Sequence, residues 1–454
     1  MAEHLSALDA TFLELEQDDP SAHMHIGGLL IFEPRPDGSI PSVEELTAHL
    51  DSRLGELPRY HQRLSDTRVH GLRFPTWELE VDLDLRQHVS RAALPTPGGR
   101  AELLAWVSDY WSHRLDRTRP LWDVVLLEGL QGGRWALVNR THHCMVDGVG
   151  SMDVGYAVLD TTPEPQERMP YAPPAPEPHR GRASSLAHAL DPRGLPDLVT
   201  RSRAMADVLV RDELIAAPTT SLNEAIGTLR RIETVRFELD ELKAVKNRLG
   251  GTVNDVVLAA CAGALRALFL YRDEVPPRRG MRAMVPMNIR DAAERLGLGN
   301  RVTSLFAQLP VAEADPLRRY AVVTEETTRL KGGHEALGAK TILDVTSMAP
   351  PLLHAALART LYASRLFNVT ITNVPGPPMT LYGLGSELRD IYGLVPIFTD
   401  HALGVCIVSY GGGITFTVSA DRTSVPDLDV FRTALEESMD ELRSLAAGAI
   451  PVAW

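Results

Sequence analysis

The sequence has few cysteines and no excess of basic residues, and both shortages narrow the possible classes of protein. Its 454 residues include only Cys144, Cys261 and Cys406, an odd number at wide spacing. Such usage predicts reduced thiols in a cytosolic setting, not a disulfide framework or a paired-cysteine zinc site. The 46 basic residues are outnumbered by 59 acidic ones, which gives a formal net charge of −13. We therefore expect no nucleic-acid partner, because phosphate binding requires a basic surface.

The sequence also shows no targeting or membrane-spanning segment. It begins with MAEHLSALDATFLELEQ, which is acidic and has no basic leader before an apolar core, so we expect no secretory signal. The most apolar long window, Val253 to Tyr271, contains Asn254, Asp255 and Arg266. Polar residues at these positions predict a buried helix instead of a transmembrane one. Any membrane contact is expected to be peripheral.

Composition and length predict a globular chain with two or three lobes, since 44% of the residues are hydrophobic and 23% are charged. The clearest change in composition lies between Thr162 and Asp197, where prolines are dense. Proline fixes φ and lacks an N–H group, so this stretch predicts an extended crossover. We expect an N-terminal lobe over residues 1–161, a crossover linker with a helix over 162–220, and a C-terminal lobe over 221–454.

Hydrophobic spacing predicts a mixed α/β protein with antiparallel hairpins in both lobes. Thr252 followed by Asp255 matches the capping arrangement at the start of a helix. The expected helices lie near residues 5–15, 148–160, 239–250 and 252–271. The expected strands are residues 23–33, a hairpin of 121–128 with 134–143, and a hairpin of 402–410 with 414–421.

The segment His142-His143-Cys144-Met145-Val146-Asp147-Gly148 carries the clearest chemistry. It places an imidazole at the end of a predicted strand, and a neutral imidazole can accept a proton at physiological pH. Adjacent side chains on a strand point to opposite faces, so His142 and His143 have different surroundings. The same divergence disfavours a metal site, and we expect no metal. A histidine pair can also serve structure alone, but Gly148 and the strand-loop-helix context favour chemistry.

This segment is similar to the His-His-x-x-x-Asp-Gly active-site signature of the CoA-dependent acyltransferase superfamily. Flanking motifs resemble the bacterial wax ester synthase/diacylglycerol acyltransferases, and they keep that family's order along nearly the whole chain. The Asp-Phe-Gly-Trp-Gly motif of the plant branch is absent. The matching landmarks are LSALDATFL from Leu5, RPLW from Arg119 to Trp122, NDVVLA from Asn254 to Ala259, VPMNIR from Val285 to Arg290, GNRVTSLFAQLPV from Gly299, and TNVPGP from Thr372 to Pro377.

The resemblance implies a two-lobed α/β fold like that of chloramphenicol acetyltransferase, with mixed sheets and an active-site tunnel between the lobes. It implies transfer of a fatty acyl group from acyl-CoA to diacylglycerol or to a long-chain alcohol, without a covalent acyl-enzyme. Acyl-CoA would be a co-substrate, and no cofactor is expected. It also implies a cytoplasmic protein attached peripherally to the inner face of the membrane or to lipid droplets.

The resemblance also implies roles for the residues of the motif. His143 would be the general base that takes the proton of the acceptor hydroxyl, and His142 would support it. Asp147 would orient the motif through an arginine, for which Arg290 is a candidate. Gly148 would keep the channel open to substrate.

Three further landmarks have a structural as well as a functional interpretation. Pro120, Leu121 and Trp122 begin an apolar strand, so a core role and substrate contact both remain open. Asn254 and Asp255 lie at a helix start, where capping is the first interpretation and a place near the acyl channel is the second. Asn373 lies in a rigid loop and could hold neighbouring strands.

Two other functions remain open from the sequence. One is acyl transfer to a different hydroxyl, as in polyketide-associated acyltransferases with the same doubled histidine. The other is a catalytically silent lipid-binding protein that keeps the tunnel. Serine-nucleophile and phosphate-binding chemistry are disfavoured, because the chain has no Gly-x-Ser-x-Gly elbow and no glycine-rich phosphate loop.

Overall fold

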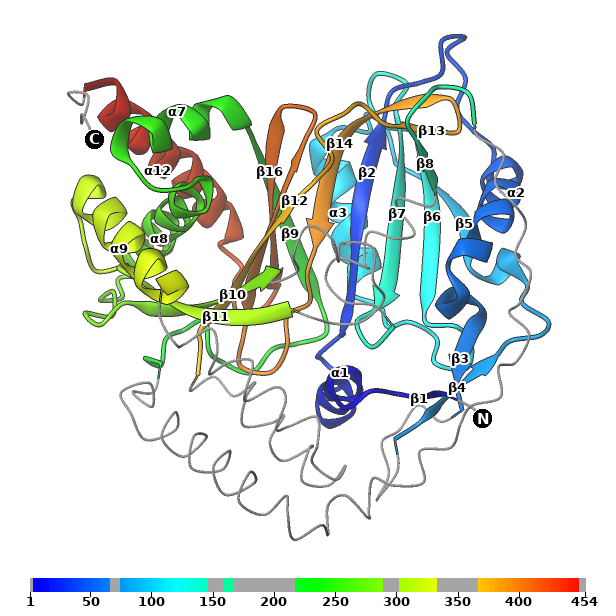
Figure 1. The fold of residues 1–454 in the computed structure, drawn as a ribbon, viewed down its shortest axis with the longest axis horizontal. Coiled ribbons are helices and arrows are strands. Elements are labelled where there is room, and N and C mark those ends of the chain that lie inside the picture. Colours follow the sequence, from blue (N-terminus) through cyan, green and yellow to red (C-terminus); the bar gives the residue numbers. More distant parts are fainter. Residues whose placement is uncertain are drawn as a thin grey trace, which may run out of the picture.

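The chain folds into two lobes that lie side by side, each built on a β-sheet (Figure 1). The computed structural model describes residues 3–65, 74–145, 158–165, 217–288, 302–332 and 366–448. The helices are α1 Ala7–Asp18, α2 Val43–Arg53, α3 Arg100–Trp111, α7 Leu239–Leu249, α8 Val253–Tyr271, α9 Pro316–Gly332 and α12 Leu428–Gly448, with 3-10 turns at Leu54–Glu56, Pro58–His61 and Leu85–Gln87. The strands are β1 Glu3–His4, β2 His25–Phe32, β3 Gln62–Leu64, β4 Thr76–Leu79, β5 Val89–Ala93, β6 Trp122–Glu128, β7 Trp135–His142, β8 Leu159–Asp160, β9 Arg230–Glu238, β10 Met281–Asn288, β11 Val302–Leu309, β12 Val369–Pro375, β13 Tyr382–Gly383, β14 Ser386–Leu394, β15 Leu403–Tyr410 and β16 Gly413–Asp421.

The N-terminal lobe contains a seven-stranded sheet in the order β5-β6-β7-β2-β14-β13-β8 within the described residues. Strands β6 and β7 form the antiparallel hairpin that the sequence predicts, and β2 pairs with β7 on its other side. Alternate side chains of β6 and β7 pack against α3 on one face of the sheet, and the intervening ones pack against α2 on the other. The alternation of the apolar residues therefore places a helix on each face.

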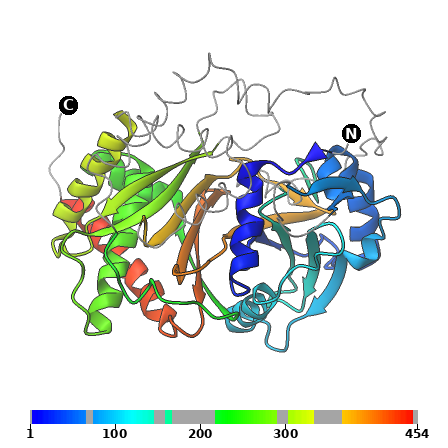
Figure 2. The ribbon, with the colours of Figure 1, turned by 90° about the horizontal axis from the view of Figure 1, so that it is seen from below.

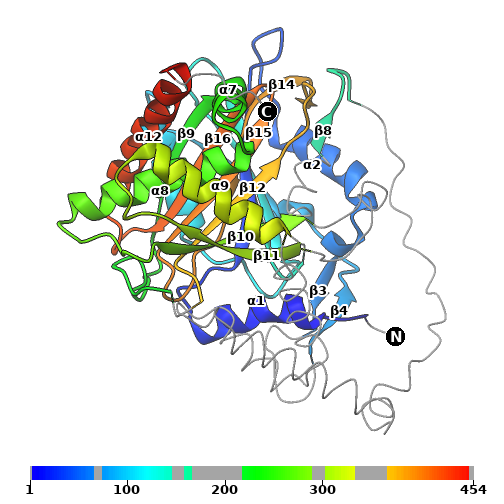
Figure 3. The same cartoon turned by 60° about the vertical axis from the view of Figure 1, so that its left-hand side comes forward.

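The C-terminal lobe contains a six-stranded sheet in the order β11-β10-β12-β15-β16-β9, and α7, α8, α9 and α12 cover one of its faces (Figure 3). Helix α8 begins with a complete capping box of Thr252 and Asp255, as predicted. It is the one helix in the described part of the chain that is long and apolar enough to span a membrane. Because 67% of its most apolar window is buried, the structure confirms the prediction of a core helix.

One strand of the second half of the chain crosses into the sheet of the first lobe. Strand β14 pairs antiparallel with β2, and β13 joins β14 to β8. An added Cβ on Gly393 would lie 2.5 Å from Cys406 Sγ, so glycine permits β14 to pack closely against β15. The predicted division into 1–161, 162–220 and 221–454 assigns residues 382–394 to the C-terminal lobe. The structure differs here, because these residues belong to the sheet of the N-terminal lobe.

Helix α3 closes the seam between the lobes by covering an edge strand. The Ser112 and Ser108 hydroxyls accept hydrogen bonds from the backbone N–H groups of Arg230 and Ile232 at 2.8 and 3.0 Å. These N–H groups lie on β9, the last strand of the six-stranded sheet. The hydroxyls therefore satisfy donors that an edge strand would otherwise leave open.

Two predicted segments lie wholly or partly outside the described residues. These are most of the proline-rich crossover and residues 148–157 of the helix expected over 148–160. The end of that helix was predicted wrongly, because Leu159 and Asp160 form strand β8 and pair with β13. Asp160 also accepts two hydrogen bonds from the buried Arg53 guanidinium at 2.8 and 2.9 Å, which holds this strand to α2.

Candidate active site

Helix α1 lies between the two lobes, next to the end of β7 that carries the histidine pair (Figure 2). The helix begins at Ser6, whose hydroxyl accepts a hydrogen bond from the backbone N–H of Asp9 at 3.1 Å. Phe12 and Glu16 are four residues apart, so they lie on the same side of the helix. Both side chains are buried against residues of the histidine segment.

His142 is fixed in one tautomer by hydrogen bonds to both of its ring nitrogens. The backbone N–H of Cys144 donates to Nδ1 at 3.1 Å, so Nδ1 carries no proton. The ring proton is therefore on Nε2, which donates to Glu16 Oε2 at 2.6 Å. Both side chains are almost fully buried. Both ring nitrogens of His142 are thus engaged by groups of the protein itself.

Glu16 is a buried carboxylate with cationic partners on the solvent side. Burial alone would raise the pKa of the Glu16 carboxyl, but the hydrogen bond from His142 and the guanidinium groups of Arg117 and Arg114 hold that pKa well below its ordinary value. Arg114 and Arg117 each approach the carboxylate to 3.1 Å. The carboxylate is thus ionised at neutral pH and remains an acceptor for His142.

His143 occupies the turn after β7 and is partly accessible. Its backbone N–H donates to the carbonyl oxygen of Met24 at 2.8 Å. Its ring stacks on Phe12, with ring centroids 3.8 Å apart and ring planes 9° from parallel. The backbone and one face of the ring are therefore fixed, which limits the directions in which the imidazole can point.

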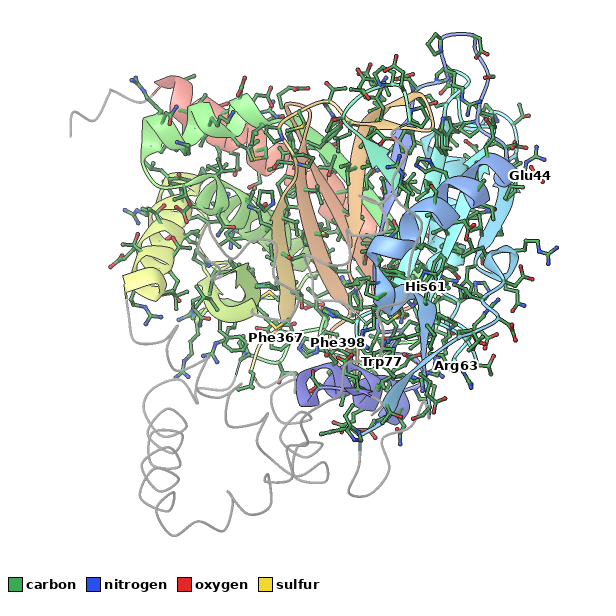
Figure 4. The ribbon with its side chains drawn as sticks, turned by 45° about the vertical axis from the view of Figure 1, so that its right-hand side comes forward. Glu44, His61, Arg63, Trp77, Phe367 and Phe398 are labelled. Atoms are coloured by element: carbon green, nitrogen blue, oxygen red, sulfur yellow. The ribbon has the colours of Figure 1, made fainter. Side chains whose placement is uncertain are left out.

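An apolar cluster extends from His143 toward the C-terminal lobe. We call it the Phe12 cluster, and Figure 4 shows two of its members, Phe367 and Phe398, beside α1. Such surroundings exclude water and suit a hydrocarbon chain better than a polar ligand. The cluster consists of Phe12, Leu15, Ala22, Met24, Phe367 and Phe398, with Met284, Phe306 and Leu366 packed against it.

The other titratable groups next to the pair are poor proton acceptors or nucleophiles. Burial lowers the pKa of His23 to about 4 and that of His25 well below its ordinary value, so both imidazoles are neutral at pH 7. Burial also raises the pKa of the Cys144 thiol well above its usual range, so this cysteine is not a thiolate nucleophile. Across the described ranges, no three His, Cys, Asp or Glu side chains converge as metal ligands would.

The landmark Pro120-Leu121-Trp122 lies in the core of the N-terminal lobe. All three residues are buried. The Trp122 indole donates to the carbonyl oxygen of Tyr60 at 2.9 Å, and its ring stacks on His88 with centroids 4.4 Å apart. These contacts are those of a core residue, one of the two roles that the sequence leaves open for this landmark.

The structure brings together two landmarks that are more than a hundred residues apart in sequence. Asn373 Nδ2 donates to Asn254 Oδ1 at 3.5 Å, which links β12 to the first turn of α8. Asp255 caps the helix by accepting from the backbone N–H of Thr252 at 2.7 Å. Its other oxygen accepts from the Thr327 hydroxyl at 2.6 Å. The predicted capping role of Asp255 is confirmed.

Some predicted residues cannot be placed, and other residues of the site were not predicted. Asp147, Gly148 and Arg290 lie outside the described residues. The residues that sequence reasoning missed are Phe12, Glu16, Arg114 and Arg117. A signal for Glu16 exists, because it is a carboxylate one turn after Phe12 on the apolar side of the predicted helix.

The low pKa of Glu16 predicts how the stability of the protein depends on pH. The folded pKa lies below the unfolded value of about 4.3, so ionised Glu16 stabilises the fold above that pH. Wild type should exceed Glu16→Gln by about 3 kcal/mol in free energy of unfolding at pH 7. This difference in free energy of unfolding should become smaller as the pH falls from 5 toward 3. Urea titrations of both proteins at each pH measure it.

Glu436→Gln is the matched control, because Glu436 pairs with Arg432 at 2.7 Å but its side chain is 42% exposed. This change should alter the free energy of unfolding by less than about 0.5 kcal/mol at every pH. A difference between wild type and Glu16→Gln that stayed constant down to pH 3 would contradict the assignment of an ionised carboxylate.

Sequence comparisons agree with the geometry. The model of the wax ester synthase/diacylglycerol acyltransferase catalytic domain matches residues 5–257, and the model of the WS/DGAT C-terminal domain matches residues 298–443. The chain is 34% identical to the probable diacylglycerol O-acyltransferase tgs2 of Mycobacterium tuberculosis, over 96% of this chain and 97% of that protein. It is 30% identical to the probable diacylglycerol O-acyltransferase tgs1 of the same species, over 98% and 96%.

Comparisons with solved structures confirm the two-lobed acyltransferase fold that the resemblance implies. A wax ester synthase/diacylglycerol acyltransferase from Marinobacter aquaeolei VT8 matches with a TM-score of 0.74 and 28% identity, over 98% of this chain and 100% of that chain. The starter condensation domain of rhizomide synthetase, in complex with C8-CoA, shares the fold with a TM-score of 0.62 and 15% identity, over 99% and 96%. The chain therefore belongs to the wax ester synthase/diacylglycerol acyltransferase family of acyltransferase enzymes.

Proposed function

We propose that this enzyme transfers a fatty acyl group from acyl-CoA to the hydroxyl of diacylglycerol, giving triacylglycerol, or of a long-chain alcohol, giving a wax ester. The observation that carries the proposal is the different placement of the two adjacent histidines, one buried at the end of β7 and one partly accessible in the turn. Glu16 and the Cys144 N–H group engage both nitrogens of His142. His143 lies in the adjoining turn, where it is partly accessible and stacks on Phe12 beside the apolar cluster, so it is the imidazole of the pair that a substrate can reach.

In the proposed reaction, His143 removes the proton of the acceptor hydroxyl. The oxygen attacks the carbonyl carbon of the thioester and a tetrahedral intermediate forms. The C–S bond then breaks, and the CoA thiolate receives the proton from the His143 imidazolium. No covalent acyl-enzyme is needed, and the high pKa of the Cys144 thiol agrees with this. Asp147 would orient the turn through Arg290, and Gly148 would leave room for substrate.

The character of the substrate follows from the surroundings of His143. Phe12 covers one face of the imidazole, and the rest of the Phe12 cluster continues this apolar wall toward β10 and β11. Moving a long acyl chain or alcohol from water to such a wall is favourable, because apolar surface is buried. A polar acceptor would instead lose its hydrogen bonds to water. The relatives named as diacylglycerol O-acyltransferases support the same class of acceptor.

The test is release of CoA thiol from palmitoyl-CoA with dioleoylglycerol or hexadecanol as acceptor, together with detection of the ester. His143→Ala should lower turnover by about 100- to 10,000-fold, the range for loss of a general base. His113→Ala is the control, since His113 is an exposed histidine after α3. Turnover by His143→Ala equal to wild type would contradict the base assignment, and binding of acyl-CoA without turnover by wild type would indicate a lipid-binding protein.

We also propose that the enzyme reaches its apolar acceptors by peripheral attachment to a lipid surface on the cytoplasmic side of a membrane or on lipid droplets. With a formal net charge of −13, exposed apolar side chains and not attraction to anionic lipid should provide the attachment. The fraction bound to phosphatidylcholine vesicles containing dioleoylglycerol should therefore stay unchanged between 0.1 and 1 M NaCl, because salt screens charges only. Complete release at 1 M NaCl would contradict this mode of attachment.

A further inference from the structure

One row of register partners runs across all six strands of the sheet in the C-terminal lobe. Successive members are paired by the antiparallel and parallel ladders, so their side chains share one face of the sheet. This face points away from α8 and α12, because on β11, β10, β12, β15 and β16 the residues on either side of each member belong to the core that those helices cover. The row consists of Phe306, Met284, Thr370, Gly404, Ser419 and Ile232.

Thr370 places a buried hydroxyl in this row. Thr370 is 9% exposed as a residue, and its Oγ1 has no hydrogen-bond partner among the described residues. The neighbouring residues on β12, Val369 and Ile371, face the helices instead. A buried hydroxyl without a partner is costly in the resting protein. Such a hydroxyl is available to a ligand that supplies the missing partner, and its position decides whether a ligand can reach it.

The Thr370 hydroxyl lies on the wall that faces the histidine. Met284 is the register partner of Thr370 on β10, and Met284 packs against the Phe12 cluster. Phe12 in turn stacks on His143. Figure 4 shows Phe367, which lies three residues before Thr370, beside α1. The base thus comes from the N-terminal lobe and the hydroxyl from the C-terminal lobe, on two sides of the same apolar cluster.

We propose that the Thr370 hydroxyl donates a hydrogen bond to the carbonyl oxygen of the acyl thioester. This inference rests on the proposed acyl transfer. When the acceptor oxygen forms its bond to the carbonyl carbon, the C=O electron pair moves to the carbonyl oxygen, and Thr370 stabilises that negative charge. When the C–S bond breaks, the electron pair returns to the C=O bond, and His143 gives its proton to the thiolate. Thr370 keeps its own proton throughout.

Thr417 on β16 offers a matched control on the same sheet. Thr417 is 1% exposed as a residue, and its hydroxyl also has no hydrogen-bond partner in the described part of the chain. Its register partners are Thr234 of β9 and Cys406 of β15, and β16 lies two strands further from β10 than β12 does. Removing this hydroxyl changes a buried polar group without changing the wall next to the Phe12 cluster.

The experiment compares Thr370→Val, Thr370→Ser and Thr417→Val in the palmitoyl-CoA assay. Thr370→Val should lower kcat by about 100- to 1,000-fold, as loss of one oxyanion donor does, with the KM for palmitoyl-CoA within about twofold of wild type. Thr370→Ser keeps the hydroxyl and should retain most of kcat. Thr417→Val should match wild type. The melting temperature of Thr370→Val should equal or exceed that of wild type, because an unpartnered buried hydroxyl has been removed.

A Thr370→Val enzyme that keeps the wild-type kcat would overturn the proposal while leaving acyl transfer by His143 intact. Equal losses of kcat in Thr370→Val and Thr417→Val would overturn it too. They would mean that removing any buried hydroxyl from this sheet lowers kcat. A lower melting temperature in Thr370→Val would show that the hydroxyl already has a partner in the resting protein. A wild-type enzyme that releases no thiol would contradict the proposed function itself.

Discussion

A buried carboxylate, Glu16, joins helix α1 to the end of strand β7 through its hydrogen bond with His142. This bond fixes the tautomer of His142, and the N–H group of Cys144 then completes the ring's hydrogen bonds. The turn that carries His143 follows directly, so the direction of His143 depends on the same bond. Arg114 and Arg117 keep the carboxylate ionised and therefore keep the bond strong.

The second constraint is the crossing of β14 into the sheet of the N-terminal lobe. Pairing of β14 with β2 holds the two sheets next to each other, while α3 and its serine hydroxyls close the seam at β9. The proposed base, His143, and the proposed thioester-binding residue, Thr370, come from different lobes, so their separation depends on this crossing. Rigid strands on both sides suit a reaction that needs its groups placed within a fraction of an ångström.

Much of the fold is predictable from local patterns, whereas the site is predictable only in part. Helix α8 follows from its capping box, and the β6–β7 hairpin follows from apolar runs around a glycine turn. The crossing of β14 was not predicted, because pairing between strands several hundred residues apart leaves no local signal. The motif identifies His143, but Glu16 lies far from it in sequence. Only the packing of α1 shows that the two residues belong together.

We infer that Glu16 acts through the histidine turn and has no separate role in the reaction. A double-mutant cycle of Glu16→Gln and His143→Ala tests this, measured on kcat/KM for palmitoyl-CoA with one acceptor. We expect Glu16→Gln to lower kcat/KM in the wild-type background but to change it by less than about twofold once His143 is alanine. If the two losses multiply in the double variant, Glu16 acts independently of His143, which contradicts a role through the turn.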